Sequence, residues 1–382
     1  MKKVLMFTHH LSGGGAEKAM CIIAAWFARH PEKDIEASVM VVYDDVGKRM
    51  ELEKQGVRVY VTKARSKNDD PVVVKGINVL RKIRELKKKK KELAVDTCLS
   101  FLPGSDIINV LSDIGERRVV SVRSRESEFV HSVWKKLYVK TAYKRSDLIT
   151  AVSDAVNRDV VGFFGEDPGR VVTIPNIIYP PAPEDHECGD SGFLSFAQGK
   201  RLVICVGRLS PEKGHRTLLG AFAKVLGDIK DAGLVLVGDG PVRKDIEGYV
   251  RTLGIADRVY FAGYSTRPAQ YLLRSEIFVL PSDVEGMPNA LLEAIACGLP
   301  SVSTDCGVRE IIFPSMAEEK VTGVVEGTYG LLTPVGDEEA LACGIKRLLE
   351  DAPLRDRYRA LGEKCLAPYS EEAVMDKWTS VL

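Results

Sequence analysis

Two glutamates, Glu285 and Glu293, stand eight residues apart in this chain, with the sequence Gly-Met-Pro-Asn directly after the first. Pro288 suits the first turn of a helix, where a backbone amide donor is not needed. We therefore expect Glu285 on a loop and Glu293 on the helix that follows it. At ~1.5 Å rise per residue the two carboxylates would lie ~10 Å apart along the axis. This separation is too long for one acid/base pair, but it suits two ends of one extended polar ligand.

A second candidate group is the segment Gly207–Gly214, which reads Gly-Arg-Leu-Ser-Pro-Glu-Lys-Gly and follows the apolar run 202–206. This order predicts a strand, then a turn that carries Arg208 and Lys213, then a helix. A guanidinium and an ammonium near a helix N-terminus can bind a diphosphate without a metal ion. The expected position is the carboxyl end of a strand, where open α/β sheets bind ligands.

Together these segments resemble the donor-binding half of retaining glycosyltransferases of family 4, which have the GT-B fold. The E-x7-E element, the G-R-x-x-x-x-K-G element, Val-Gly-Asp-Gly-Pro at 237–241 and Gly-Gly-Gly-Ala-Glu at 13–17 occur in that family's order. The resemblance covers essentially the whole chain. It implies an α/β protein with two Rossmann-like domains whose parallel sheets face a central cleft.

The resemblance also implies that the two domains bind different substrates. Residues 1–178 would form an acceptor-binding domain, and residues 179–369 would hold the nucleotide sugar. The last helix, 370–382, would pack back on the first domain. Its apolar positions Val374, Trp378 and Leu382 share one face.

The roles of individual residues follow from the same resemblance. Glu285 is expected to contact the donor sugar, Glu293 the ribose hydroxyls, and Arg208 with Lys213 the diphosphate. The nucleotide base is held in the family at the equivalent of 260–264, largely through backbone atoms. The full set of expected binding positions is Gly14, Gly15, Gly207, Arg208, Lys213, Tyr264, Gly286, Met287, Pro288, Asn289 and Glu293.

One departure from the family concerns the sugar side of the site. Family members commonly have a histidine at the end of a strand in the first domain. Here the expected strand 119–122 is followed by Arg123 and the sequence Ser-Arg-Glu-Ser, with no histidine before His131. We expect Arg123 to take the place of that histidine, so it joins Glu285, Arg208 and Lys213 as a candidate catalytic residue.

The glycines at 13–15 follow the first expected strand and begin a helix. They do not form G-x-G-x-x-G, because Lys18 occupies the place of the last glycine, so a nicotinamide fingerprint and a P-loop are excluded. Two interpretations remain: a flexible helix cap, or backbone amides close to the donor phosphate or the acceptor. The turn at 238–241 is expected to shape the site rather than to contact substrate.

The bulk composition excludes several classes of protein. The chain has 382 residues, enough for two domains, and a net charge of +1 that gives no reason to expect nucleic acid binding. No run reaches the ~18–20 apolar residues that a membrane span requires. The eight cysteines form no C-x-x-C pair, which predicts reduced thiols in a cytoplasmic protein.

The lysines at 87–91 form an unbroken basic run at the end of an expected helix. One interpretation is a solvated helix face. The other is a patch that attracts anionic lipid head groups, to which each basic residue contributes about 1 kcal/mol. The second interpretation would place the protein on the inner face of the membrane as a peripheral enzyme.

Apolar runs alternate with amphipathic segments, which predicts two parallel sheets covered by helices. A proline- and glycine-rich stretch at 178–200 is expected to be an exposed linker. Helices are expected at 16–29, 74–91, 130–145 and 338–350. Strands are expected at 4–8, 37–42, 57–61, 95–101, 119–122, 148–152, 171–174, 202–206, 234–237, 259–261, 277–280 and 301–303.

The expected function is retaining transfer of a hexose or N-acetylhexosamine from a nucleotide-diphosphate sugar, with UDP favoured, to a glycan or lipid-linked saccharide during surface polysaccharide synthesis. No D-x-D sequence is present, so neither a metal ion nor another cofactor is expected. Two alternatives remain. One is a UDP-sugar 2-epimerase on the same fold, and the other is a non-catalytic nucleotide-binding protein.

Overall fold

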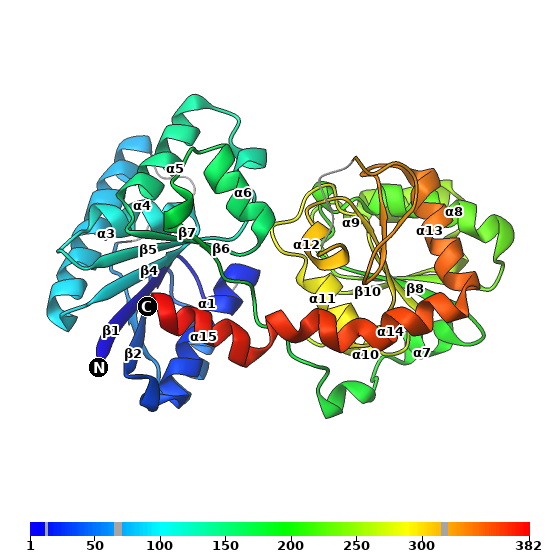
Figure 1. Cartoon of the computed structure of the whole chain (residues 1–382), viewed down its shortest axis with the longest axis horizontal. Helices are drawn as coiled ribbons and strands as arrows, with labels where there is room; N and C mark the ends of the chain where they lie inside the picture. The colour runs from blue at the N-terminus through cyan, green and yellow to red at the C-terminus, as the bar shows by residue number, and fades with distance from the viewer. Residues whose placement is uncertain (12–13, 65–70, 315–319) are drawn as a thin grey trace. The chain divides into compact units, whose positions relative to one another are not determined.

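The computed structural model in Figure 1 describes residues 1–11, 14–64, 71–314 and 320–382. Contacts divide the chain into two compact units, Met1–Ile177 with Glu372–Leu382 and Ile178–Glu371. Each unit has its own seven-stranded sheet. The sequence analysis divided the chain after residue 178 and began the returning helix at residue 370.

The sheet of the N-terminal unit has the order β3-β2-β1-β4-β5-β6-β7, and neighbouring strands are parallel. The chain moves outward from β1 to β3 and then returns to continue at β4. The switch point of this doubly wound sheet therefore lies between β1 and β4. The strands are β1 (Lys2–Thr8), β2 (Ile35–Val41), β3 (Arg58–Val61), β4 (Thr97–Phe101), β5 (Arg117–Val122), β6 (Leu148–Ala151) and β7 (Val171–Thr173).

Helices cover both faces of this sheet, with α1 and α15 on one face and α3 to α6 on the other (Figure 1). Helix α15 is amphipathic, and its buried Trp378 packs against Phe101 of β4 with the ring centroids 6.4 Å apart. This contact ties the end of the chain to its first sheet. The helices are α1 (Gly15–Arg29), α2 (Val46–Lys54), α3 (Val72–Leu93), α4 (Pro103–Leu111), α5 (Val133–Arg145), α6 (Asp154–Gly162) and α15 (Glu371–Val381).

The sheet of the C-terminal unit has the order β10-β9-β8-β11-β12-β14-β13, and only the β13–β14 pair is antiparallel among the described strands. Its switch point lies between β8 and β11 by the same reasoning. The strands are β8 (Arg201–Val206), β9 (Ala232–Val237), β10 (Val259–Gly263), β11 (Ile277–Leu280), β12 (Ser301–Thr304), β13 (Val325–Glu326) and β14 (Leu331–Thr333).

Two hydrophobic clusters lie on the two faces of this second sheet. One cluster joins the sheet to α8, α9 and α13, and the other joins it to α7, α10 and α11. The helices are α7 (Ser191–Ala197), α8 (His215–Asp228), α9 (Arg243–Thr252), α10 (Ala269–Leu272), α11 (Asn289–Ala296), α12 (Arg309–Ile312), α13 (Glu338–Glu350) and α14 (Ala352–Leu366).

The prediction that residues 178–200 form an exposed linker is wrong for the second half of that stretch. Phe193 of α7 is fully buried, and its ring packs against that of Tyr271 with the centroids 4.9 Å apart. Asp190 caps α7 and accepts hydrogen bonds from the hydroxyls of Tyr260, at 2.8 Å, and Tyr271, at 2.9 Å. Buried aromatic contacts therefore outweigh the local composition.

The five lysines at 87–91 do not form one patch. Consecutive helix positions are turned by ~100°, so a run of five surrounds α3 instead of lining one side of it. Lys90 is fully buried, Lys89 is partly buried against Tyr60, and the exposed lysines are Lys87, Lys88 and Lys91. Within the described ranges, no helix is both long enough and apolar enough to cross a membrane.

Candidate functional site

The turn after β8 and the loop after β11 meet at the switch point of the C-terminal sheet. Gly214 has φ +64°, and a Cβ atom there would lie 1.9 Å from the carbonyl oxygen of Pro281. The amide of Asp283 donates to the carbonyl of Glu212 at 2.9 Å. Because only glycine permits this approach, the backbone holds the cationic turn against the loop that carries Glu285.

The Gly-Asp-Gly-Pro turn after β9 supports the same segment from its other side. A Cβ atom on Gly238 would lie 1.9 Å from the oxygen of Gly207, and one on Gly240 would lie 2.2 Å from the oxygen of Leu209. Both glycines are therefore needed for close packing of backbone on backbone. This agrees with the expectation that the turn shapes the site.

Lys213 and Glu285, separated by 72 residues in sequence, form an ion pair in which the ammonium donates to both carboxylate oxygens at 2.7 and 2.8 Å. Glu285 is only 8% exposed. Its carboxylate also accepts from the hydroxyl of Ser282 at 2.7 Å, and its amide donates to the carbonyl of Cys306 at 2.7 Å. The two residues are thus brought together, although the sequence analysis assigned them to different parts of the ligand.

Arg208 lies in the same turn but in a different environment. Its side chain is exposed, and no carboxylate among the described residues forms an ion pair with it. The site therefore offers one compensated and one uncompensated positive charge beside the N-terminus of α8. Such a pair favours an anionic ligand.

The second predicted glutamate lies on α11, where the sequence placed it. Pro288 is the residue directly before the helix, so Glu285 is on the preceding loop and Glu293 is half-buried within α11. The intervening positions Gly286, Met287 and Asn289 are partly exposed. Tyr264 follows β10, and its side chain is 78% exposed.

His215 is the first residue of α8 and was not singled out from the sequence. It is 3% exposed, and burial, with Lys213 nearby, lowers its pKa to about 4. The imidazole is therefore neutral near pH 7, and its Nδ1 atom has no hydrogen-bond partner within the described structure. A signal was present, because His215 directly follows the Lys-Gly end of the turn.

The remaining predicted residues belong to the N-terminal unit. Arg123 follows β5, and its guanidinium donates to Asn176 and lies 5.5 Å from the ring centroid of Phe101. Burial lowers the pKa of Arg123 to about 10. It remains cationic near pH 7 and, in the described ranges, has no carboxylate partner.

The glycines at the start of α1 take part in helix capping. The amide of Gly14 donates to the carboxylate of Glu17 at 3.1 Å, which is the reciprocal contact of a capping box. Gly15 is the first residue of α1. Gly13, the first residue of this motif, lies outside the described residues.

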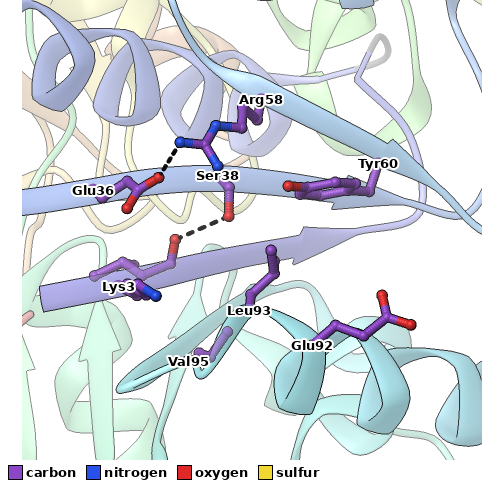
Figure 2. A pocket seen from close by; sticks show the side chains of 9 residues that line it. Lys3, Glu36, Ser38, Arg58, Tyr60, Glu92, Leu93 and Val95 are labelled. Atoms are coloured by element: carbon purple, nitrogen blue, oxygen red, sulfur yellow. Dashed lines mark hydrogen bonds and ion pairs between the residues drawn. The ribbon is translucent and has the colours of Figure 1, made fainter.

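A pocket of about 370 Å³ lies elsewhere, at the amino ends of β1, β2 and β3 and the end of α3 (Figure 2). Figure 2 shows Arg58 and Glu36 pointing toward each other, with an ion pair of 2.5 Å. Glu92 is paired with Lys89 at 2.7 Å. The pocket lies at the amino ends of these strands, whereas Arg123 follows the carboxyl end of β5 in the same sheet. The two acids that line the pocket, Glu36 and Glu92, are already paired with basic residues.

Comparison with known proteins agrees with the fold. Residues 200–351 match the family described as glycosyl transferases group 1. The N-acetylgalactosamine-N,N'-diacetylbacillosaminyl-diphospho-undecaprenol 4-alpha-N-acetylgalactosaminyltransferase of Campylobacter jejuni is 24% identical over 94% of this chain and 93% of its own. The GalNAc-alpha-(1->4)-GalNAc-alpha-(1->3)-diNAcBac-PP-undecaprenol alpha-1,4-N-acetyl-D-galactosaminyltransferase of the same organism is 24% identical over 100% of this chain and 98% of its own.

Among solved structures, Anabaena HepE in complex with UDP and glucose matches with a TM-score of 0.77 at 19% identity, covering 100% of this chain and 99% of HepE. Sucrose-phosphate synthase from Thermosynechococcus elongatus matches with a TM-score of 0.79 at 18% identity, over 100% of this chain and 98% of the synthase. At such identities the structural likeness shows the fold, which is GT-B. Together with the family match and the full-length relatives, it confirms that this chain is a glycosyltransferase resembling family 4.

Proposed function

We propose that the chain transfers a hexose or N-acetylhexosamine from a nucleotide-diphosphate sugar, with UDP as the favoured nucleotide, to a lipid-linked or glycan acceptor. The observation that carries this proposal is the group of Arg208, Lys213 and Glu285 at one switch point. The acceptor class is supported by the names of the two C. jejuni relatives, both of which act on saccharides linked to diphospho-undecaprenol. UDP is favoured because HepE was solved with UDP and glucose.

The proposed donor lies with its diphosphate on Arg208 and Lys213, its ribose on Glu293 and its sugar near Glu285. The bond between the anomeric carbon and the diphosphate oxygen breaks as the acceptor hydroxyl attacks on the same face. The departing diphosphate takes the hydroxyl proton, and the configuration is retained. Two cations offset the charge that develops on the diphosphate, which is the role of a metal ion in other transferases.

The ion pair of Lys213 and Glu285 implies that Lys213 changes its electrostatic partner when the donor binds. In the free protein the buried Glu285 carboxylate compensates the ammonium. When a diphosphate arrives, Lys213 acquires a second anionic neighbour and must be shared or turned away from Glu285. The carboxylate then gains freedom to accept a hydrogen bond from the donor sugar.

Acceptor-dependent release of nucleotide is the experiment that tests this function. Incubation with a UDP-sugar and a diphospho-undecaprenol-linked saccharide should release UDP and yield a product heavier by one sugar. A UDP-sugar 2-epimerase would instead change the donor without an acceptor. Saturable UDP-sugar binding without either reaction would support a non-catalytic binding protein.

We further propose that the enzyme works at the cytoplasmic face of a membrane, which it contacts through α5. The apolar side chains Val133, Trp134 and Leu137 are 81%, 80% and 55% exposed. The helix contains five basic residues and no acidic residue, with basic positions at 135, 136, 140, 144 and 145. Exposed apolar side chains among lysines suit an anionic lipid surface.

Sedimentation with liposomes compares α5 with the lysines of α3. Trp134→Ser should reduce binding to anionic vesicles severalfold, while Met50→Ser, an exposed apolar residue of α2, should not. Replacing Lys87, Lys88 and Lys91 by glutamine should weaken binding less than Trp134→Ser does. Equal binding of wild type and Trp134→Ser would remove α5 from the membrane contact.

A further inference from the structure

The buried face of α3 carries two lysines. Asn78, Lys82, Leu86 and Lys90 follow one another at intervals of four residues, and each is 5% exposed or less. Positions four apart lie on one side of a helix. Both lysines therefore project toward the interior of the N-terminal unit, where an ammonium without a partner is costly.

Lys90 has a complete set of partners. Its ammonium donates to the Glu116 carboxylate at 2.5 Å and to the backbone and side-chain oxygens of Asn109 at 2.9 and 2.8 Å. The Glu116 carboxylate also accepts from the amide of Ile114 at 2.8 Å. The fold thus compensates this buried charge fully, as expected for a structural lysine.

Lys82 has no such partners. It is 4% exposed, and across the described ranges no hydrogen bond or ion pair holds its ammonium. Its Nζ atom lies 5.8 Å from the centroid of the Tyr43 ring. Burial lowers the pKa of Lys82.

The surroundings of Lys82 lie at the carboxyl edge of the sheet. His9 follows β1, Tyr43 follows β2, and Ser105 is in the first turn of α4 after β4. His9 Nδ1 lies 2.8 Å from the hydroxyl of Ser105, and the ring of His10 stacks on Tyr43 with the centroids 4.7 Å apart. Strands β1 and β4 flank the switch point, where doubly wound sheets bind ligands.

The described side chains of this group, Lys82, His9, His10, Tyr43 and Ser105, include no carboxylate. Burial, with Lys82 and His10 nearby, lowers the pKa of His9 to about 4, so its imidazole is neutral near pH 7. The neighbouring acids have other partners. Asp44 pairs with Arg49, the side chain of Asp45 caps α2, and Glu85, three residues after Lys82, accepts from the amide of Lys63 at 2.7 Å. An uncompensated cation in a partly desolvated setting attracts an anion strongly.

We propose that Lys82, with His9, His10 and Tyr43 around it, forms a binding site for a phosphate group of the acceptor. This inference rests on the proposed function, in which the acceptor is a saccharide on a lipid diphosphate and binds the N-terminal unit. The ammonium contributes the charge. The hydroxyl of Ser105 and the neutral imidazole of His9 contribute hydrogen bonds.

The test uses the full chain saturated with UDP, so that the donor site is filled, and inorganic pyrophosphate as the probe. Calorimetric titration should detect binding to wild type. Lys82→Gln should weaken this binding by about tenfold or more, as expected for loss of a charge-assisted hydrogen bond. Lys87→Gln, which removes an exposed charge from the same helix, should change the affinity less than twofold.

Two results would overturn the proposal. One is equal pyrophosphate affinity of the Lys82→Gln and Lys87→Gln variants, and the other is displacement of pyrophosphate by UDP, which would place the probe in the donor site. Titration of UDP alone keeps the two proposals separate, because Lys82→Gln should bind UDP like wild type. A protein that fails to bind UDP would contradict the proposed function rather than this site.

A second readout does not depend on the folding of a variant. In wild-type enzyme labelled with 13C-lysine, pyrophosphate should raise the pKa of one lysine, Lys82, whose pKa is lowered by burial, because an anion favours the charged form. That resonance should be absent from the spectrum of Lys82→Met. A pKa that is unchanged at saturating pyrophosphate would exclude contact between the probe and Lys82.

Discussion

The two sheets present lysine and histidine side chains at equivalent switch points but compensate the lysines differently. In the C-terminal unit, Lys213 is bound by both oxygens of Glu285, and the neighbouring His215 is buried and neutral. In the N-terminal unit, Lys82 has no acidic partner among the residues that the structure describes, and the neighbouring His9 is likewise neutral. The same topology therefore produces one preformed ion pair and one lysine that has no carboxylate partner in the described part of the chain.

This difference suggests two ways of preparing for an anion. At the C-terminal site, the ion pair keeps Lys213 ordered before the ligand arrives, and Arg208 supplies the uncompensated charge. At the N-terminal site, the lysine itself stays uncompensated, so a bound phosphate would relieve an existing cost. The ion pair at the C-terminal site suits a lysine that must exchange one anionic partner for another during the reaction. The uncompensated lysine at the N-terminal site suits a group that only binds the phosphate and holds it in place.

The largest effect is expected at the C-terminal cations. Arg208→Ala and Lys213→Ala should each lower turnover by about 100-fold or more, the size typical of a lost charge-stabilising donor. Lys224→Ala removes a lysine that is paired with Glu339 on the outer side of α8, and it should retain near-normal turnover. The turnover numbers of the folded variants, measured by steady-state kinetics, test this prediction. Normal turnover of Arg208→Ala or of Lys213→Ala would exclude the replaced residue from the mechanism.

The two glutamates should respond differently to neutralisation. Glu293→Gln should weaken the binding of both UDP and the UDP-sugar by about tenfold, because the proposed partner of Glu293 is the ribose that both ligands contain. Glu285→Gln should impair transfer yet leave UDP affinity unchanged or up to about tenfold tighter, because Lys213 loses its competing carboxylate.

Titration of UDP and of the UDP-sugar into both variants measures this difference. Glu247→Gln is the matched control, since Glu247 is paired with Arg243 on α9. Weaker UDP binding by Glu285→Gln would show that the ion pair assists the diphosphate instead of competing with it.

The neutral histidines predict an acid-labile fold. Each has a folded-state pKa of about 4, below the ordinary value of 6.5. The unfolded chain therefore binds a proton that the folded chain does not, and stability falls as the pH drops from about 6.5 toward 4. Each histidine should cost about 2 kcal/mol of unfolding free energy by pH 5.

Urea unfolding at about pH 7.5 and pH 5 measures this loss. His9→Gln and His215→Gln should each flatten the pH dependence, while the exposed His186→Gln should leave it as in wild type. A pH dependence that is identical in all three variants would mean that neither imidazole is held neutral.

The smallest effect is expected from metal removal. Activity should persist in excess EDTA. The proposed diphosphate site contains Arg208 and Lys213, and the sequence has no D-x-D motif to bind a metal ion. Turnover before and after chelation measures this. Complete loss in EDTA, restored by Mg²⁺ or Mn²⁺, would show that the diphosphate site has been misassigned.

Local patterns in the sequence were sufficient for most of the fold. Every strand expected from apolar runs corresponds to an observed strand, and the helix over 338–350 has the expected bounds. Strands β13 and β14, of two and three residues, were not predicted. Residues 178–200 were misassigned because the burial of Phe193 depends on aromatic residues about 70 positions away.

The site was predictable only where a motif marked it. Arg208, Lys213, Glu285 and Glu293 all lie on or beside the elements expected for them. The ion pair could not be foreseen, since it joins residues 72 positions apart through a glycine contact. Lys82 was hidden within a basic helix, although its four-residue spacing from Leu86 and Asn78 is a periodic signal for a buried position.

Thermal unfolding with a panel of UDP-, GDP- and ADP-sugars tests the central claim most directly, because it requires no knowledge of the acceptor. A donor present at 100 times its dissociation constant should raise stability by about 2.7 kcal/mol. We predict that a UDP-sugar stabilises wild type and the Lys224→Ala control by this amount but stabilises Arg208→Ala much less. Absence of stabilisation by any nucleotide sugar, or equal stabilisation of Arg208→Ala, would contradict a donor site at the switch point of the C-terminal sheet.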